Sequence, residues 1–265
     1  VTGTVESIPL IASSIISKKI AAGAHGIILD VKIGSGAFMK SKEKAFELAE
    51  ILVRIGQKLG RTVKVILTDM HQPLGYTIGN ALEVKEAIRT LKGKGPEDLK
   101  KLVLELAKEL LLIAGKTEEE AEALKIVEEN LSNGSALAKF RQLVEAQGGD
   151  PRVLDDLRLL TSASFISSFK AEKQGYVQEI AADKIGRAAQ LLGAGRLKKE
   201  DRIDPGAGIE LCKKIGDYVQ KGERLALLYT NRENSQGKAL SLVKDAFTIG
   251  ENFIQPPPLF YGKLG

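Results

Sequence analysis

The spacing of apolar residues changes repeatedly along the first quarter of the chain, and each change predicts a different element. Apolar residues recur at helical spacing over residues 7–21, where Pro9 suits the first turn because its missing N–H would have no partner there. Residues 27–33 form a short, β-branched apolar run that is typical of a buried strand. Helical spacing returns over residues 41–59, and residues 63–68 form a second apolar run. The pattern predicts helix, strand, helix and strand in that order.

The strand–helix–strand part of this pattern predicts two parallel strands joined by a right-handed crossover. In open sheets of this kind, ligands bind beyond the carboxyl ends of the strands. The segments that follow the two strand ends, residues 32–38 and 68–75, are rich in glycine and polar residues. We therefore expect a binding site at this edge of the sheet.

The middle of the chain predicts four amphipathic helices whose charged side chains face solvent. Their expected bounds are residues 80–91, 96–114, 117–131 and 134–147. Thr117 followed three positions later by Glu120 fits the capping-box pattern at the start of the third of these helices. The sequence Gly-Gly-Asp-Pro then ends the helical spacing, and the stretch 148–163 is the predicted boundary between subdomains.

Short strands become frequent after this boundary. The expected strands are residues 165–171, 176–180, 209–213 and 225–229, and the expected helices are residues 183–192 and 233–249. The segment 216–222 resembles the turn of biotinyl- and lipoyl-type modules, but no lysine stands in the Met-Lys context that such carriers modify. This likeness indicates a β-rich fold rather than an acyl carrier.

The predicted fold class is therefore α/β. It consists of part of a helical domain over residues 1–22, then a mixed or parallel sheet flanked by helices over residues 23–160. A C-terminal α+β subdomain of barrel-sandwich (biotinyl-like) type is expected over residues 161–265.

The composition excludes several classes of partner. The chain has 265 residues, 43% hydrophobic and 28% charged, and its formal charge of +5 is spread among intermixed acidic and basic residues. Neither a basic stripe for nucleic acid nor an aromatic platform for bases is present, and no apolar run is long enough to cross a membrane. The single cysteine, Cys212, cannot form an internal disulfide, and a cytoplasmic location is expected.

The first predicted helix carries a pair of groups suited to ligand binding. Ser14 and Lys18 are four residues apart, so a hydroxyl and an ammonium project side by side from a largely apolar helix. Such a pair suits a small, flat ligand that carries oxygen atoms. The simpler interpretation is an amphipathic helix with a solvated lysine at its end.

Three further candidates are weaker. The turn Gly34-Ser35-Gly36 could bind phosphate through its N–H groups, although a plain turn is the favoured interpretation. His71 lies in a loop at the expected site, but no second histidine or cysteine stands at zinc-ligand spacing. The loop 72–80 followed by Glu86 could bind a cation through carbonyl and carboxylate oxygens, or Glu86 could be an exposed helix residue.

Several long segments, in the same order, resemble the thymidine and pyrimidine-nucleoside phosphorylase family. The resemblance extends over essentially the whole chain. The matching segments are VTGTVESIPLIASSIISKK at 1–19, LDVKIGSGAFM at 29–39, DMHQPLGYTIGNALEVKE at 69–86, LGAGRLKKEDRID at 192–204, GDYVQKGE at 216–223 and PPPLFY at 256–261.

This resemblance implies a reversible phosphorolysis. Phosphate attacks C1′ of a pyrimidine nucleoside such as uridine, thymidine or deoxyuridine, and the products are the free base and a pentose 1-phosphate. The resemblance also implies phosphate as co-substrate, no organic cofactor and a homodimer. By their positions in the matching segments, Ser14 and Lys18 are implied to hold the base and act in catalysis, with Ile11 and Phe38 as its apolar contacts.

The resemblance further implies a structural cation site, with potassium as the expected ion. Its ligands would be the carbonyls of Leu74 and Thr77 and the carboxylate of Glu86. Thr77 stands where the family more often has alanine, which a carbonyl ligand tolerates, and His71 also departs from the family pattern.

The family's base-binding arginine and its phosphate-binding residues come before the segment that begins this chain. The chain is therefore expected to be the C-terminal part of such an enzyme and to be inactive alone. Two alternatives remain: a phosphorylase of nucleoside monophosphates in the same superfamily, and a non-catalytic biotinyl-like binding module.

Overall fold

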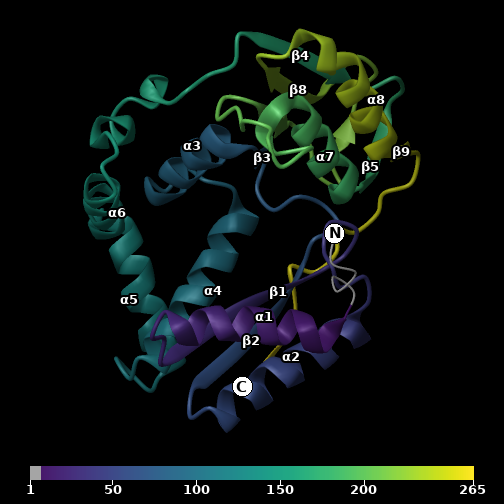
Figure 1. Cartoon of the computed structure of the whole chain (residues 1–265). Helices are drawn as coiled ribbons and strands as arrows, with labels where there is room; N and C mark the ends of the chain where they lie inside the picture. The colour runs from purple at the N-terminus through teal and green to yellow at the C-terminus, as the bar shows by residue number, and fades with distance from the viewer. Residues whose placement is uncertain (1–6) are drawn as a thin grey trace. The chain divides into compact units, whose positions relative to one another are not determined.

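The computed structural model describes residues 7–265 and divides them into two compact units, which are described separately (Figure 1). The first unit contains residues 7–70, 101–129 and 257–265, and the second contains residues 71–100 and 130–256. The structure confirms the α/β class, with helices and both parallel and antiparallel strand pairs. No helix within residues 7–265 combines the length and the apolar character that a bilayer crossing requires.

The first unit is built on a three-stranded sheet in the order β1-β2-β10. Strand β1 (Gly26–Ile33) pairs in parallel with β2 (Thr62–Asp69), which confirms the predicted parallel pair. Strand β10 (Phe260–Leu264) adds to the other side of β2 in the antiparallel direction and was not predicted. A side-chain contact also joins β10 to β2, because the Tyr261 hydroxyl donates to Asp69 Oδ1 at 3.0 Å.

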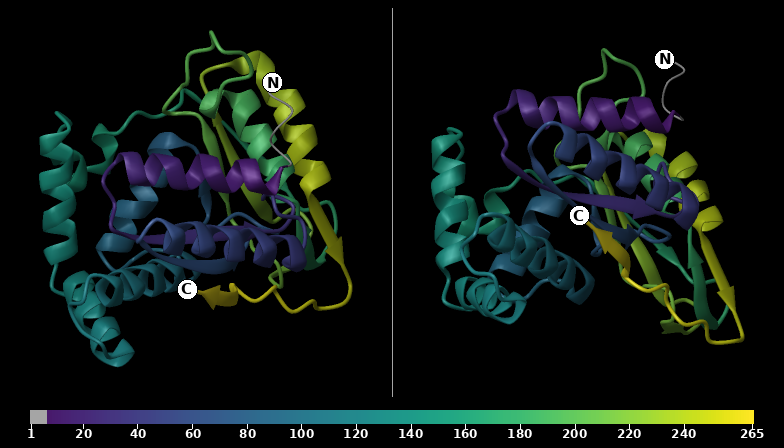
Figure 2. Two further views of the ribbon diagram at one scale, coloured as in Figure 1. Left: turned by 60° about the horizontal axis from the view of Figure 1, so that its bottom comes forward. Right: turned by 90° about the horizontal axis from the view of Figure 1, so that it is seen from below.

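Two helices cover one face of this sheet. Helix α2 (Lys42–Lys58) packs on β1 and β2, and α1 (Ile8–Ala21) packs on α2 (Figures 1 and 2). The Ser41 hydroxyl accepts a hydrogen bond from the Lys44 N–H and caps α2. The core between these layers consists of small and branched apolar side chains, among them Ala12, Ile16, Val31, Ala45, Leu52 and Val65.

Residues 101–129, which include most of α4 (Glu97–Ile113) and of α5 (Glu120–Ser132), supply the rest of the first unit, and here two predictions are wrong. Glu109 of α4 is fully buried rather than solvated, because Lys64 of β2 and Lys263 of β10 reach its carboxylate. The Thr117 hydroxyl accepts from the Glu119 N–H and bonds Glu122, so Glu120 does not complete a capping box.

The second unit contains two antiparallel sheets. The larger has the order β3-β6-β8-β4, formed by β3 (Thr77–Ile78), β6 (Gly208–Leu211), β8 (Arg224–Thr230) and β4 (Phe165–Lys170). The smaller has the order β7-β5-β9, formed by β7 (Tyr218–Val219), β5 (Gly175–Ile180) and β9 (Phe247–Gly250).

Helices complete the second unit. They are α3 (Asn80–Leu91), α6 (Ser135–Ala146), α7 (Ala182–Ala189) and α8 (Gln236–Ala246), with a π-helical turn at Gln190–Ala194 and short 3-10 turns at Pro151–Leu154, Leu157–Leu159 and Glu233–Ser235. The main apolar core of this unit lies among α7, α8 and the strands, with Ile185, Leu192, Ile209, Leu228 and Val243 fully buried.

Two predicted helices of this unit are shorter than expected. The last helix was expected to continue to residue 249, but it ends at Ala246, and the aromatic and β-branched residues that follow form β9 against β5. Helix α7 ends at Ala189 and passes into the π-helical turn, where Gly193 has a φ of +119° that a side chain would oppose.

Candidate functional site

Helix α1 brings the predicted Ser14 and Lys18 pair together. Ala12 and Ile16 are buried on the core face of the helix, so Ser14 and Lys18 lie on its exposed face. The Lys18 Nζ donates to Ser14 Oγ at 3.0 Å. Ser7 precedes the helix but makes no side-chain capping bond, and Pro9 supports the first turn instead. A hydroxyl and an ammonium are therefore held at a fixed spacing and open to solvent.

The two predicted apolar contacts of the base lie in the same unit. Ile11 is one turn before the Ser14 and Lys18 pair and is half-buried against the core of the unit. Phe38 lies in the loop after β1, and its side chain is 73% exposed. The Phe38 ring is therefore accessible to a ligand, although single exposed apolar residues such as Ile166 and Phe253 also occur elsewhere in the chain.

The loop after β1 is a structured turn. The Gly34 N–H donates to the Met39 carbonyl at 3.1 Å, and the Gly36 N–H donates to the Met70 carbonyl at 3.0 Å. Two of the N–H groups that a phosphate would need are therefore already paired within the protein. The geometry favours the plain turn over the phosphate-binding interpretation of Gly34-Ser35-Gly36.

A polar cluster at the carboxyl ends of β1 and β2 was not assigned from the sequence. The Lys32 Nζ lies 2.7 Å from Asp30 Oδ2 and donates to Thr68 Oγ1 at 2.9 Å, while Thr68 also bonds Asp30. The signal in the sequence was two charged residues inside an otherwise apolar strand. Because charges within a sheet are costly unless paired, these three side chains stabilise one another.

In the second unit, the loop before β3 brings Thr77 and Gly75 against Glu86 of α3. The Tyr76 N–H donates to Glu86 Oε1 at 2.9 Å, and the Glu86 side chain is buried. Gly75 has a φ of +66°, and a Cβ on it would lie only 2.2 Å from Glu86 Oε2. Only glycine lets the backbone approach the carboxylate this closely. Glu86 is thus not the exposed helix residue of the simpler interpretation.

The electrostatics of Glu86 fit a cation. Burial raises the pKa of Glu86, and this outweighs the hydrogen bonds from Tyr76 and Thr77. Among residues 7–265, no lysine, arginine or histidine forms an ion pair with this carboxylate. The buried Thr77 hydroxyl beside it makes no hydrogen bond of ordinary geometry, although it lies near enough to favour the ionised form. Hard oxygen donors around an uncompensated carboxylate are the chemistry that potassium or a similar ion requires.

Two residues that were not predicted from the sequence, Lys214 and Asp98, also bind this loop. The Lys214 Nζ binds the carbonyls of Pro73 and Gly75, the latter at 2.7 Å, and lies 3.1 Å from Asp98 Oδ2. Asp98 in turn accepts from the Gly75 N–H at 3.1 Å. The residues that meet here are distant in the sequence, so no local spacing could reveal them. Leu74, the remaining predicted ligand, is half-buried within the same loop.

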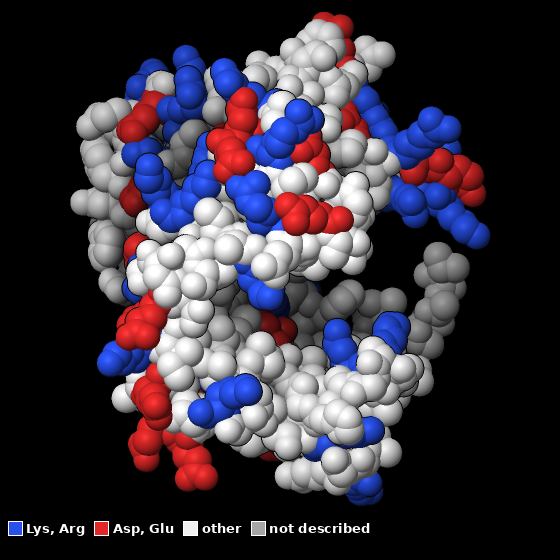
Figure 3. All heavy atoms as spheres, turned by 90° about the vertical axis from the view of Figure 1, so that its left-hand side faces the viewer, with Lys and Arg blue, Asp and Glu red and all other residues white. Residues whose placement is uncertain are grey.

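Charge on the surface agrees with the sequence expectation. Lysine and arginine side chains are interspersed with aspartate and glutamate on the face drawn in Figure 3. Ion pairs between residues close in sequence, such as Arg152 with Asp150 and Arg158 with Asp156, also place opposite charges side by side. No single-sign stripe is evident on that face.

Comparison with known proteins assigns the family. The model of the "Glycosyl transferase family, a/b domain" matches residues 1–137, and that of the "Pyrimidine nucleoside phosphorylase C-terminal domain" matches residues 176–250. The chain belongs to the glycosyl transferase family, and its second half is similar to the C-terminal domain of pyrimidine-nucleoside phosphorylases. Both matches agree with the resemblance inferred from the sequence, and the first includes Ser14, Lys18, Phe38 and Glu86.

Individual relatives are similar over most of the chain. A pyrimidine-nucleoside phosphorylase of Bacillus subtilis (strain 168) is 57% identical over 234 residues, which is 88% of this chain and 54% of the relative. Those of Staphylococcus aureus strains USA300 and N315 are 51% identical over 256 residues, which is 97% of this chain and 59% of each relative. The chain thus spans a little over half the length of the curated relatives it matches.

Proposed function

We propose that the chain takes part in the reversible phosphorolysis of pyrimidine nucleosides such as uridine, thymidine and deoxyuridine, as the names of its relatives suggest. Phosphate is the co-substrate, and no organic cofactor is needed. The observation that carries this proposal is the Ser14 and Lys18 pair on the exposed face of α1. Because the relatives are named pyrimidine-nucleoside phosphorylases, we propose a pyrimidine base as the ligand of this pair. The adjacent hydroxyl and ammonium suit the oxygen-bearing edge of such a base.

In this reaction an oxygen of phosphate forms a bond to C1′ while the bond from C1′ to N1 of the base breaks. The electron pair of that bond leaves with the base, so negative charge gathers on the pyrimidine oxygens and N3. The Lys18 ammonium donates to these atoms and stabilises the charge as it develops. The Ser14 hydroxyl donates to or accepts from the base edge, and the helix keeps both groups in register.

Ile11 and Phe38 are proposed to contact the faces of the base. Support comes from the accessible Phe38 ring and from the place of Ile11 one turn before Ser14. Apolar contacts on a flat ring fix its orientation without competing for its polar edge. Hydrogen bonding by Ser14 and Lys18 then distinguishes the pyrimidine from other flat ligands.

We also propose that Glu86 and the carbonyls of Leu74 and Thr77 hold a structural potassium ion. The buried carboxylate without an ion pair and the close approach of Gly75 support this site. The ion would supply the positive charge that Glu86 lacks and would fix the loop before β3. It takes no part in bond making or bond breaking.

Three finer features are proposals of the same kind. The C-terminal subdomain over residues 161–265 is proposed to be a biotinyl-like barrel-sandwich, supported by antiparallel strand pairs within this stretch and by the turn at residues 216–222. The working form is a homodimer, as the family resemblance implies. A cytoplasmic location is consistent with the single cysteine, Cys212.

Phosphate-dependent release of uracil from uridine, followed by absorbance, tests the proposed reaction. We compare Lys18→Met with the matched control Lys19→Met within a full-length enzyme that includes this chain, since the chain is expected to be inactive alone and both lysines are exposed on the last turns of α1. Loss of a charged donor at such a site lowers kcat by about a hundredfold or more. Turnover that is lost in Lys18→Met and kept in Lys19→Met supports the assignment, whereas equal rates in both variants contradict it.

A further inference from the structure

We propose that Lys214 is a positioning residue for the cation site of the second unit. Its ammonium binds two carbonyls of the loop before β3 and thereby sets the geometry of the loop's carbonyl ligands. This inference rests on the proposed potassium site, and it adds a residue that would touch neither the ion nor the nucleoside.

The contacts of Lys214 are numerous for a lysine. Its Nζ binds the carbonyls of Pro73 and Gly75, forms an ion pair with Asp98 at 3.1 Å and lies 5.5 Å from the centre of the Tyr76 ring. Its side chain is only 12% exposed. A solvated surface lysine would not meet two backbone carbonyls, a carboxylate and an aromatic ring at once.

These contacts lie on both sides of Leu74, whose carbonyl is a proposed ligand of the ion. Pro73 and Gly75 are the neighbours of Leu74 in the chain, so Lys214 fixes the peptide units on both sides of the Leu74 carbonyl. Asp98 adds a hydrogen bond from the Gly75 N–H at 3.1 Å. With the neighbouring carbonyls held by the ammonium, the position of the Leu74 carbonyl is restricted before any ion binds.

The rest of the loop is fixed by strand β6 and the segment after it. The Leu211 N–H donates to the Tyr76 carbonyl at 2.7 Å, and the Ile215 N–H donates to the Gln72 side chain at 3.0 Å. Lys214 therefore belongs to a stretch that already lies along the loop, and its ammonium completes the attachment. Without it, the carbonyls of Pro73 and Gly75 would lose their partner.

The charge of Lys214 does not oppose a second cation nearby. Asp98 pairs with the ammonium and offsets its charge, while Glu86 has no basic partner among the described residues. The Lys214 ammonium would thus pair with Asp98, and the proposed potassium ion would pair with Glu86. Groups that orient metal ligands from the second layer contribute about 10- to 100-fold to metal affinity, and we expect Lys214 to act in this range.

Thermal unfolding of the chain over a potassium chloride titration tests this role, with choline chloride keeping the ionic strength constant. The variants are Lys214→Met and Lys214→Arg, and the control is Lys213→Met, whose lysine pairs with Glu223 at 2.6 Å. We expect the potassium concentration for half of the stabilisation to rise about tenfold in Lys214→Met and to rise less in Lys214→Arg. It stays unchanged in Lys213→Met.

The outcomes separate the two levels of the proposal. Lys214→Met could lower the midpoint of thermal unfolding without changing the potassium concentration needed for half of the stabilisation. In that case Lys214 is a structural residue and the inference is overturned. If the unsubstituted chain does not respond to potassium, the proposed cation site itself is wrong, and the inference is overturned with it. Should Lys214→Met fail to fold by circular dichroism, the potassium dependence of Lys214→Arg decides in the same way.

Discussion

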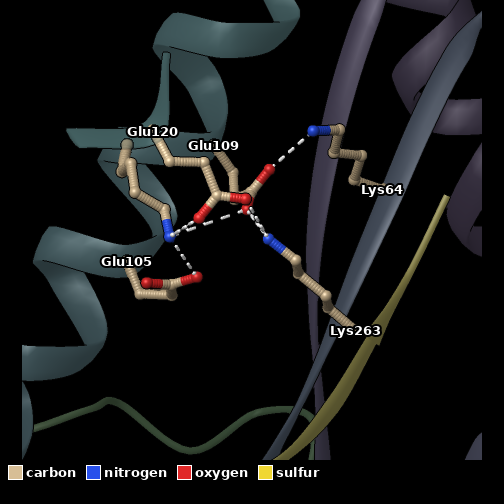
Figure 4. Close-up of polar contacts among 6 residues, drawn as sticks. Lys64, Glu105, Glu109, Glu120 and Lys263 are labelled. Atoms are coloured by element: carbon tan, nitrogen blue, oxygen red, sulfur yellow. Dashed lines mark hydrogen bonds and ion pairs between the residues drawn. The ribbon is translucent and has the colours of Figure 1, made fainter. Parts of the chain in front are cut away.

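Removing the charge of Glu109 is expected to destabilise the first unit strongly. This carboxylate is fully buried and accepts hydrogen bonds at 2.7 Å from both Lys64 and Lys263, as Figure 4 shows. Those lysines lie on β2 and β10. The Glu109 carboxylate on α4 therefore connects three elements that are far apart in the sequence. In Glu109→Gln the shape is kept, but the ammonium groups of Lys64 and Lys263 lose a charged partner, and so does the more distant Lys108 at 3.9 Å.

The size of the effect follows from the exposure of the partners. Breaking a buried ion pair by removing one member costs about 3–5 kcal/mol. Here Lys64 and Lys263 are 25% and 48% exposed and can regain water, and Lys263 keeps Glu120 at 2.9 Å. We therefore expect a loss of about 2–3 kcal/mol in the free energy of unfolding, which lowers the melting temperature by about 5–10 °C.

Urea and thermal unfolding measured by circular dichroism provide the assay, with Glu105→Gln as the control. Among residues 7–265, Glu105 pairs with Lys108 of its own helix at 2.8 Å and is partly exposed, so its substitution should cost less than about 1 kcal/mol. If Glu109→Gln costs no more than Glu105→Gln, the buried carboxylate does not hold the strands and the reasoning is refuted.

The same network predicts how stability changes with acid. Burial would raise the pKa of Glu109, but hydrogen bonds from Lys263 and Lys64 outweigh it and leave the pKa below its usual value. Lys263 and Lys108 lower the pKa of Glu120 to about 2. Carboxyl groups with a lowered pKa stabilise the fold above their unfolded pKa and lose that contribution as the pH falls through the folded pKa.

Stability is therefore expected to decline between about pH 4.5 and pH 2. Because Glu109→Gln lacks one of the groups that titrate, its decline should be shallower than that of the unsubstituted chain. Urea unfolding at half-unit pH intervals measures both slopes. Parallel curves for the two proteins would contradict the assignment of this acid dependence to Glu109.

Two further substitutions test local features. Gly75→Ala adds a Cβ at 2.2 Å from Glu86 Oε2 at a φ of +66°, whereas Gly60→Ala has a φ of +64° with no atom within 4 Å of the new Cβ. We expect both variants to lose about 1–2 kcal/mol of stability, because a side chain is strained in the left-handed backbone region. We expect Gly75→Ala to lose more than Gly60→Ala and to abolish the stabilisation by potassium, measured by thermal unfolding. Equal losses would show that Glu86 moves away freely. Ser41→Ala removes the cap of α2 and should cost about 0.5–1 kcal/mol by urea unfolding, since the hydrogen bond to Lys44 N is long at 3.4 Å; no loss would mean that the cap is not formed in solution.

Local patterns were sufficient to predict what depends on near neighbours in the chain. The parallel pair of β1 and β2 followed from two apolar runs around an amphipathic helix, and the Ser14 and Lys18 contact followed from their spacing of four. The strand β10 was missed because its partner β2 lies at the other end of the chain and the intervening prolines suggested only an extended tail.

Long-range electrostatics account for the other misses. Glu109 stands among polar residues on an amphipathic helix, and nothing near it in the sequence reveals that lysines of β2 and β10 will bury it. Lys214 likewise lies in a hairpin segment, far in sequence from the loop that it binds. In both cases the chemistry depends on which strands pair, and residue spacing carries no information about that.

Binding of free uracil to the chain tests the central claim most directly, because it requires only the proposed base site. Thermal unfolding is measured with increasing uracil for the unsubstituted chain, Ser14→Ala, Lys18→Met and the controls Ser13→Ala and Lys19→Met. We predict that uracil raises the midpoint of the unsubstituted chain and of both controls, and that the rise is lost or needs at least tenfold more uracil in Ser14→Ala and Lys18→Met. A rise of the same size in all five proteins, or no rise in any of them, would contradict the assignment of the base to Ser14 and Lys18.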